Sequence, residues 1–199
     1  MVSRKLSKDE FVFKPVTMSE WGDLQTLFSR FPAPRMCWCM YWRKTRSEWW
    51  GSAEENKESM RTVIESGRVP GILAYAGGQP VAWCSVAPRS EFPGLDRSPT
   101  LKKVDDEPVW SITCFVIAKE YRRKGMTSIL AQEAVDYAAR NGAKVIEACP
   151  LINEEGKYRT LGESFMGFAS TFERLGFKQV SNRSRVRNIV RLYLITRRG

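Results

Sequence analysis

The chain has 199 residues, and 43% of them are hydrophobic, which is enough to bury one core in a single domain spanning residues 1–199. The formal net charge of +10 attracts polyanions, so nucleic acid, an acidic membrane face and a phosphorylated cofactor are all candidate partners. No apolar run approaches the roughly 18 residues of a membrane span, and the charged first ten residues differ from a signal peptide, so we expect a cytoplasmic protein.

The hydrophobic pattern predicts alternating strands and helices. In chain order these are a strand over 11–16, helices over 19–31 and 52–66, strands over 72–76, 81–87 and 109–117, a helix over 127–141, a strand over 144–149, a helix over 165–175, and strands over 177–181 and 189–196. Ser19 is the predicted N-cap of the first helix, and Pro32 its end. Gly77-Gly78 predicts a hairpin turn. This order indicates an α/β (α+β) fold whose sheet is mixed, mostly antiparallel and flanked by helices.

Two segments do not follow either period. Residues 35–51 are dense in aromatic residues and include Cys37-Trp38-Cys39. Residues 88–107 form a long polar loop with three prolines, and loops of that length are usually functional or mobile. The sequence has no histidine and five scattered cysteines, so the common zinc and disulfide patterns are missing. We expect buried, reduced thiols, with metal or redox use of the Cys-Trp-Cys pair as the alternative.

The most informative segment is the end of the strand over 109–117 and the turn after it. This buried strand runs into Arg122-Arg123-Lys124-Gly125, and a helix follows directly. The first turn of a helix has free N–H groups and a partial positive charge, so it binds phosphate well. Gly125 would let an anion approach the backbone, and the basic residues supply charge. The spacing matches neither the Walker motif nor the Gly-x-Gly-x-x-Gly dinucleotide motif, and a plain basic loop is the alternative.

The segment resembles the acyl-CoA signature of the GNAT N-acyltransferase superfamily, Arg/Gln-x-x-Gly-x-Gly/Ala. Arg122, Gly125 and Thr127 fall on its fixed positions, although Thr127 replaces the usual Gly or Ala. Gly176-Phe177 resembles the end of the family's last helix. The resemblance covers residues 72–177 best.

The resemblance implies an acyltransferase that uses acetyl-CoA as co-substrate and no metal. The central strand would splay from the strand over 144–149, with the pantetheine arm in the gap. An N–H group of Val116 or Ile117 would bind the oxyanion. The implied cofactor-binding residues are Phe115, Val116, Ile117, Arg122, Arg123, Lys124, Gly125, Met126, Thr127 and Ser128.

Two chemical groups that many family members use are replaced here. Phe172 stands where the resemblance implies a tyrosine acid, and Ser111 stands where it implies a glutamate base. Glu147 on the neighbouring strand and Tyr158 in the following loop are therefore the candidate catalytic residues, with Cys114 behind them. A chain of water molecules is the alternative base.

The predicted reaction is direct transfer of the acetyl group to a primary amine of a small molecule or peptide. Residues 35–50 would form one wall of the acceptor site, and residues 89–99 another. The alternative is a catalytically degenerate module that binds acyl-CoA or nucleic acid, because the C-terminal stretch from Arg183 to Arg198 is basic. We expect no membrane partner and regard nucleic acid as the weaker candidate, and a homodimer is left open.

Overall fold

The computed structural model describes residues 4–44, 51–152 and 164–194. Its centre is a seven-stranded sheet in the order β1-β2-β3-β4-β5-β7-β6. The strands are β1 Val12–Pro15, β2 Gly71–Ala76, β3 Gln79–Pro88, β4 Trp110–Ile117, β5 Val145–Ala148, β6 Lys178–Gln179 and β7 Val190–Tyr193. Neighbouring strands are antiparallel except β4 and β5, which are parallel. The predicted mixed, mostly antiparallel α/β fold is confirmed.

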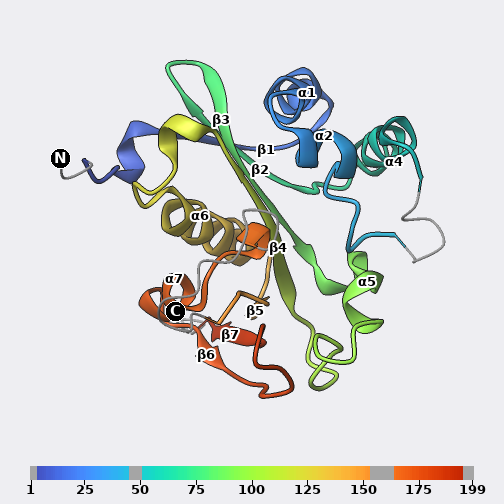
Figure 1. Cartoon of the computed structure of the whole chain (residues 1–199), viewed down its shortest axis with the longest axis vertical. Coiled ribbons are helices and arrows are strands. Elements are labelled where there is room, and N and C mark those ends of the chain that lie inside the picture. The colour runs from blue at the N-terminus through green and yellow to red at the C-terminus, as the bar shows by residue number, and fades with distance from the viewer. Residues whose placement is uncertain (1–3, 45–50, 153–163, 195–199) are drawn as a thin grey trace.

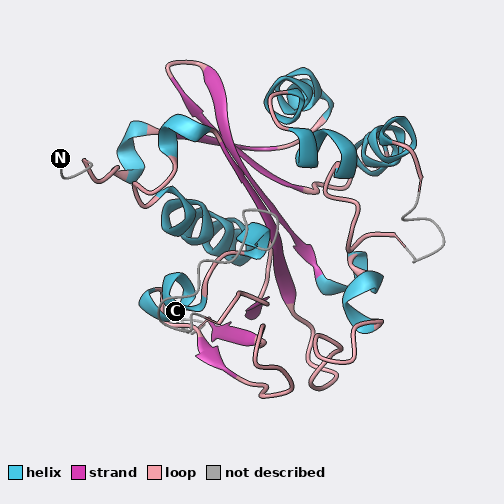
Figure 2. Cartoon of the chain, in the orientation of Figure 1, coloured by secondary structure: helices cyan, strands magenta, loops and turns pink. Residues whose placement is uncertain are grey.

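Helices cover both faces of the sheet (Figure 1; Figure 2). One group comprises α1 Trp21–Ser29, α2 Pro32–Cys37 and α4 Ala53–Glu65. The other comprises the long helix α6 Met126–Arg140 and the short α7 Ala169–Arg174. A short α5, Pro93–Asp96, follows β3. No helix of the described residues is both long enough and apolar enough to cross a membrane.

Each face of the sheet has its own core. Phe28 of α1 packs edge-on against Trp83 of β3, and both are fully buried. On the opposite face, α6 buries Leu130 and Ala134 against the sheet. A third cluster, around Phe92 and Leu95, lies under the segment between β3 and β4. The predicted polar loop over 88–107 therefore contains a short helix and a core of its own.

Several predicted boundaries were wrong at helix ends. Thr17, and not Ser19, caps the first helical turn, because its hydroxyl accepts the Ser19 N–H group. Pro32 begins α2 instead of only ending α1, since a proline suits the first position of a helix. Ser52 caps α4 in a complete capping box, as the sequence indicates.

The helix predicted over 165–175 is shorter than its hydrophobic pattern suggests. A 3-10 turn spans Ser164–Met166, and α7 begins only at Ala169. Gly167 separates the two with a φ of +79°, which a helix cannot contain. Phe165 and Phe168 therefore lie outside α7, and both line the cavity described below.

Candidate active site

The two central strands separate after a short parallel contact. β4 and β5 pair at three positions, from Trp110 with Ile146 to Ile112 with Ala148. β5 ends there, whereas β4 continues to Ile117. The second half of β4 is therefore paired with β3 on one side only, and its other edge lies open.

The hydrogen bonds to β3 show which backbone groups face the open edge. The Ala118 N–H group donates to the Val81 carbonyl of the neighbouring strand segment at 2.9 Å. Successive residues of a strand turn their N–H groups to opposite edges. Consequently the N–H groups of Ile117 and Phe115 face the open edge, and that of Val116 faces β3. Of the two oxyanion donors predicted, Ile117 is the one that this geometry allows.

The turn after β4 has the backbone of an anion-binding loop. Arg123 has a φ of +59°, and Gly125, the N-cap of α6, has a φ of +91°. The left-handed region suits glycine, so any side chain at position 125 is strained. Because Met126 and Thr127 occupy the first turn of α6, their N–H groups have no acceptor within the helix. These groups and the helix dipole favour a bound anion.

Arg122 is held at the strand end. Its Nε donates to the Ile117 carbonyl at 2.7 Å, and its guanidinium lies 5.1 Å from the Phe31 ring centroid. The side chain thus connects the turn before α6 with the start of α2. Its positive charge stays beside the open edge of β4.

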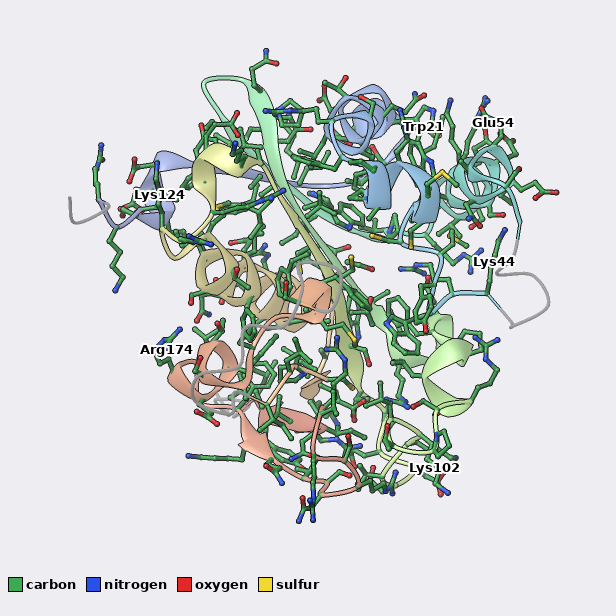
Figure 3. The ribbon with its side chains drawn as sticks, in the orientation of Figure 1. Trp21, Lys44, Glu54, Lys102, Lys124 and Arg174 are labelled. Atoms are coloured by element: carbon green, nitrogen blue, oxygen red, sulfur yellow. The ribbon has the colours of Figure 1, made fainter. Side chains whose placement is uncertain are left out.

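A cavity of about 940 Å³ joins these features. Nine of the ten predicted cofactor residues line it, namely Phe115, Val116, Ile117, Arg122, Arg123, Gly125, Met126, Thr127 and Ser128. Lys124 is the exception: it is half-buried and does not line the cavity, and its carbonyl accepts the Leu6 N–H group at 3.0 Å (Figure 3). The cavity has the size of a small-molecule site.

Other segments complete the walls of this cavity. They contribute Phe31, Pro32, Ala33, Pro34, Cys37, Cys39, Tyr41 and Cys114 from one side, and Ser164, Phe165, Gly167, Phe168, Thr171 and Arg174 from the other. The first group overlaps the predicted acceptor wall at residues 35–50, of which 45–50 lie outside the described residues. The other predicted wall, residues 89–99, does not line this cavity. Sequence reasoning missed Thr171 and Arg174, because nothing in a sequence shows which face of α7 meets β4.

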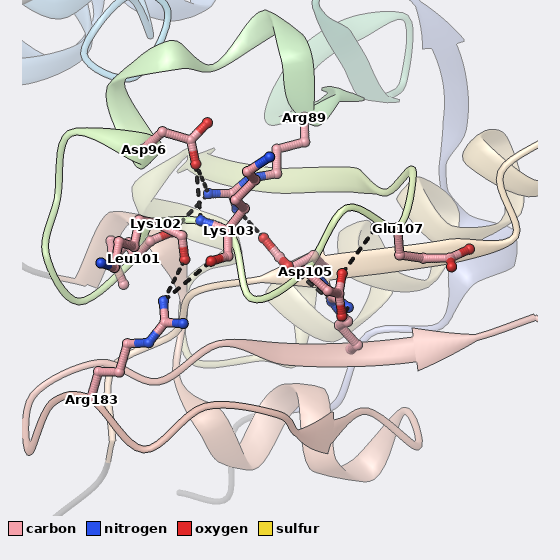
Figure 4. A network of polar contacts seen from close by, with 10 residues as sticks. Arg89, Asp96, Leu101, Lys102, Lys103, Asp105, Glu107 and Arg183 are labelled. Atoms are coloured by element: carbon pink, nitrogen blue, oxygen red, sulfur yellow. Dashed lines mark hydrogen bonds and ion pairs between the residues drawn. The ribbon is translucent and has the colours of Figure 1, made fainter.

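Glu147 lies in a buried ion-pair network. It has no exposed surface, and its carboxylate accepts hydrogen bonds from Arg89 and from Arg191, the latter at 3.0 Å. Asp96 and Asp105 pair with the outer sides of the same two arginines (Figure 4). Glu147 is not among the described residues of the cavity. Both carboxylate oxygens are occupied by guanidinium groups and the side chain lies away from the cavity, so this placement favours a structural role over that of a general base.

The other candidate catalytic residues have different positions. Tyr158 lies outside the described residues. Cys114 lines the cavity, and a hydrogen bond with Cys39 together with burial raises its pKa well above the ordinary value. Phe172 is fully buried, with its ring 6.3 Å from that of Phe115. Ser111 is buried, and its hydroxyl has no hydrogen-bond partner among the residues that the structure describes.

Comparison with known proteins agrees with this geometry. The sequence matches the acetyltransferase (GNAT) family over residues 35–168, a span that contains the open strand, the basic turn and α6. The chain belongs to the GNAT acetyltransferase family. A search of curated proteins gave no match.

Solved GNAT structures share the fold at low sequence identity. Agmatine N-acetyltransferase in its apo form is 12% identical, with a TM-score of 0.58 over 94% of this chain and 100% of its own. The Drosophila melanogaster polyamine N-acetyltransferase is 11% identical, with a TM-score of 0.54 over 92% and 100%. The PaiA N-acetyltransferase of Thermoplasma acidophilum, solved with coenzyme A, is 12% identical, with a TM-score of 0.52 over 92% and 99%. At these identities the likeness concerns the fold alone.

Proposed function

We propose that this GNAT chain transfers the acetyl group of acetyl-CoA to a primary amine of a small molecule or peptide by direct attack. One observation carries the proposal. The open edge of β4, two arginines and the first turn of α6 line the same cavity, and two further walls of that cavity are left for an acceptor.

The open strand edge and the turn fit the chemistry of coenzyme A. The pantetheine arm is an extended chain with amide groups, and the open edge of β4 offers the N–H groups of Phe115 and Ile117 to such a chain. The pyrophosphate is an anion, and Arg122, Arg123 and the N-terminus of α6 offer positive charge. Position 125 holds a glycine at a φ of +91°, so the backbone can approach a phosphate without side-chain obstruction.

The reaction needs few catalytic groups. The neutral amine attacks the thioester carbon, a C–N bond forms, and the C–S bond breaks to release the thiolate. The N–H group of Ile117 or Phe115 would stabilise the oxyanion that forms on the way. No carboxylate lines the cavity among the described residues, so we assign removal of the amine's proton to water. The thiolate leaves readily at neutral pH.

The nucleic-acid alternative has little support from the basic C-terminal stretch. Arg191 is buried in the network around Glu147. Arg183 donates to the carbonyls of Lys102 and Lys103, and Arg187 donates to that of Cys149. These arginines stabilise the protein's own loops. The end of the stretch, residues 195–199, lies outside the described part.

The proposed function is tested by thiol release from acetyl-CoA in the presence of a panel of primary amines. We expect amine-dependent release of free coenzyme A and formation of one amide per thiol, detected by mass spectrometry. Binding of acetyl-CoA without release on any amine would instead support the binding module without turnover.

A further inference from the structure

The acceptor half of the cavity has a distinctive chemistry. We propose, building on the proposed function, that this half selects a primary amine whose remaining part is apolar and flat, such as an arylalkylamine, over a polyamine or agmatine. The specificity-determining residues are Tyr41 and Phe168 on the walls and Cys39 on the floor.

The floor is built from thiols held by a tight turn. Trp38 and Cys39 both adopt positive φ, +48° and +52°, which is unusual for residues other than glycine. The Trp38 ring packs on Trp21 at 5.5 Å and on Phe28 at 5.3 Å, and these contacts anchor the turn. The same turn brings Cys39 into hydrogen-bonding contact with Cys114 of β4.

These thiols offer an uncharged, polarisable surface. Burial, with the neighbouring Cys39, raises the pKa of Cys37 to about 12, and the pKa of Cys114 is raised as well. Cys37 and Cys114 therefore stay protonated at neutral pH and act as small apolar groups. The described residues contain no group of three or more ligands that could hold a metal ion here. A floor of this kind accommodates an apolar group and offers no counter-charge to a cation.

The walls are aromatic and partly exposed. The Tyr41 and Phe165 rings meet edge-on at 6.2 Å, across two segments far apart in the sequence. Phe165 is also covered by the Arg187 guanidinium at 5.3 Å, which holds the ring in place. Tyr41 and Phe168 remain 40% and 38% exposed, so both have apolar surface that a ligand can cover. Aromatic surface of this kind stacks well on a second ring.

The charges on the cavity walls oppose a second ammonium or guanidinium group. The charged residues among the described lining are Arg122, Arg123 and Arg174, and all three are cationic. A polyamine or agmatine carries a distal cation, which would find no carboxylate among the described residues of this lining. It would also be repelled by Arg174, the lining arginine that is not assigned to the pyrophosphate. An arylalkylamine brings only its reacting nitrogen, which must be neutral to attack.

The test compares 2-phenylethylamine with agmatine and putrescine as acceptors at saturating acetyl-CoA. We expect kcat/KM to be at least about 10-fold higher for phenylethylamine. Its ring gains aromatic contacts, whereas the distal cation of agmatine or putrescine finds no counter-charge, and each effect can change the rate about 10-fold. A peptide that begins with phenylalanine is tested as a further acceptor. Comparing it with phenylethylamine shows whether the apolar acceptor is a small free amine or a peptide N-terminus. A preference for agmatine or putrescine would overturn the proposal.

Variants test whether the aromatic walls cause the preference for phenylethylamine. Tyr41→Ala and Phe168→Ala should each lower kcat/KM for phenylethylamine about 5-fold, whereas Tyr41→Phe keeps the ring and most of the rate. Neither alanine variant should change the affinity for acetyl-CoA. Met18→Ala, at an exposed apolar residue outside the cavity, is the control. Unchanged kcat/KM in both alanine variants would contradict the assignment.

A binding measurement separates this inference from the proposed function. Phenylethylamine and agmatine are each titrated into the protein loaded with coenzyme A, which needs no turnover. If every amine fails to release thiol, the proposed transfer is wrong. Phenylethylamine binding that is at least about 10-fold tighter than agmatine binding would still support the apolar site, and equal or weaker binding would overturn it.

Discussion

Glu147→Gln tests whether this carboxylate has a structural or a catalytic role. The substitution keeps the shape of the side chain but removes the charge between Arg89 and Arg191, whose side chains are 9% and 1% exposed. Breaking a buried ion pair on one side costs about 3–5 kcal/mol. Asp96 and Asp105 remain beside the two arginines, so we expect the low end, about 3 kcal/mol.

The assay is thermal unfolding together with the pH profile of turnover. For a chain of this size each kcal/mol corresponds to roughly 2–4 °C, so the melting temperature should fall by about 6–12 °C. Glu58→Gln, the same change at an exposed position of α4, should leave it nearly unchanged. Below the melting range, the folded variant should keep the pH profile of kcat. A normal melting temperature combined with a reduced rate and a shifted profile would refute the structural role and restore Glu147 as the base.

Three further predictions address Asp96 of α5, Gly71 of β2 and the turn before α6. Burial alone would raise the pKa of Asp96, but hydrogen bonds from Arg89 and from the Lys103 N–H group outweigh burial, so the pKa is lowered. The stabilisation that Asp96 contributes is therefore full above the unfolded pKa of about 4 and is lost as the pH falls below it. Asp96→Asn should thus lower stability to urea at pH 7, with the difference shrinking below about pH 4. Gly71→Ala should cost about 2–3 kcal/mol, because a Cβ would lie 2.2 Å from a carbonyl oxygen of β3, whereas Gly22→Ala in open space should not destabilise. Arg123→Ala should weaken acetyl-CoA binding about 10-fold by calorimetry, and Lys124→Ala less than about 3-fold, because only Arg123 lines the cavity; equal losses would contradict this placement.

Sequence patterns predict those parts of the fold whose conformation depends on residues close together in the chain. The alternating runs around Gly77-Gly78 form the β2–β3 hairpin, and both glycines have the positive φ that the turn requires. The basic turn ending in Gly125 likewise shows its conformation in the sequence, because glycine tolerates the left-handed backbone.

The parts that depend on distant contacts could not be predicted. The carboxylate of Glu147 finds arginines 58 and 44 positions away, and nothing local reveals them. The apolar spacing of Phe165 and Phe168 suggests a helix, but Gly167 interrupts it, and both residues line one cavity with Tyr41, more than a hundred residues earlier in the chain. The acceptor walls are therefore a product of tertiary packing.

The central claim is that the turn around Gly125 binds acetyl-CoA, and titration calorimetry tests it directly. Gly125→Glu places a strained, negatively charged side chain where phosphate would bind, whereas Gly142→Glu makes the same change at the other end of α6, at a φ of +84°. The parent and Gly142→Glu should bind acetyl-CoA with similar affinity, and Gly125→Glu should show no binding while melting as a folded protein. Equal binding by Gly125→Glu, or no binding by the parent, would contradict the claim.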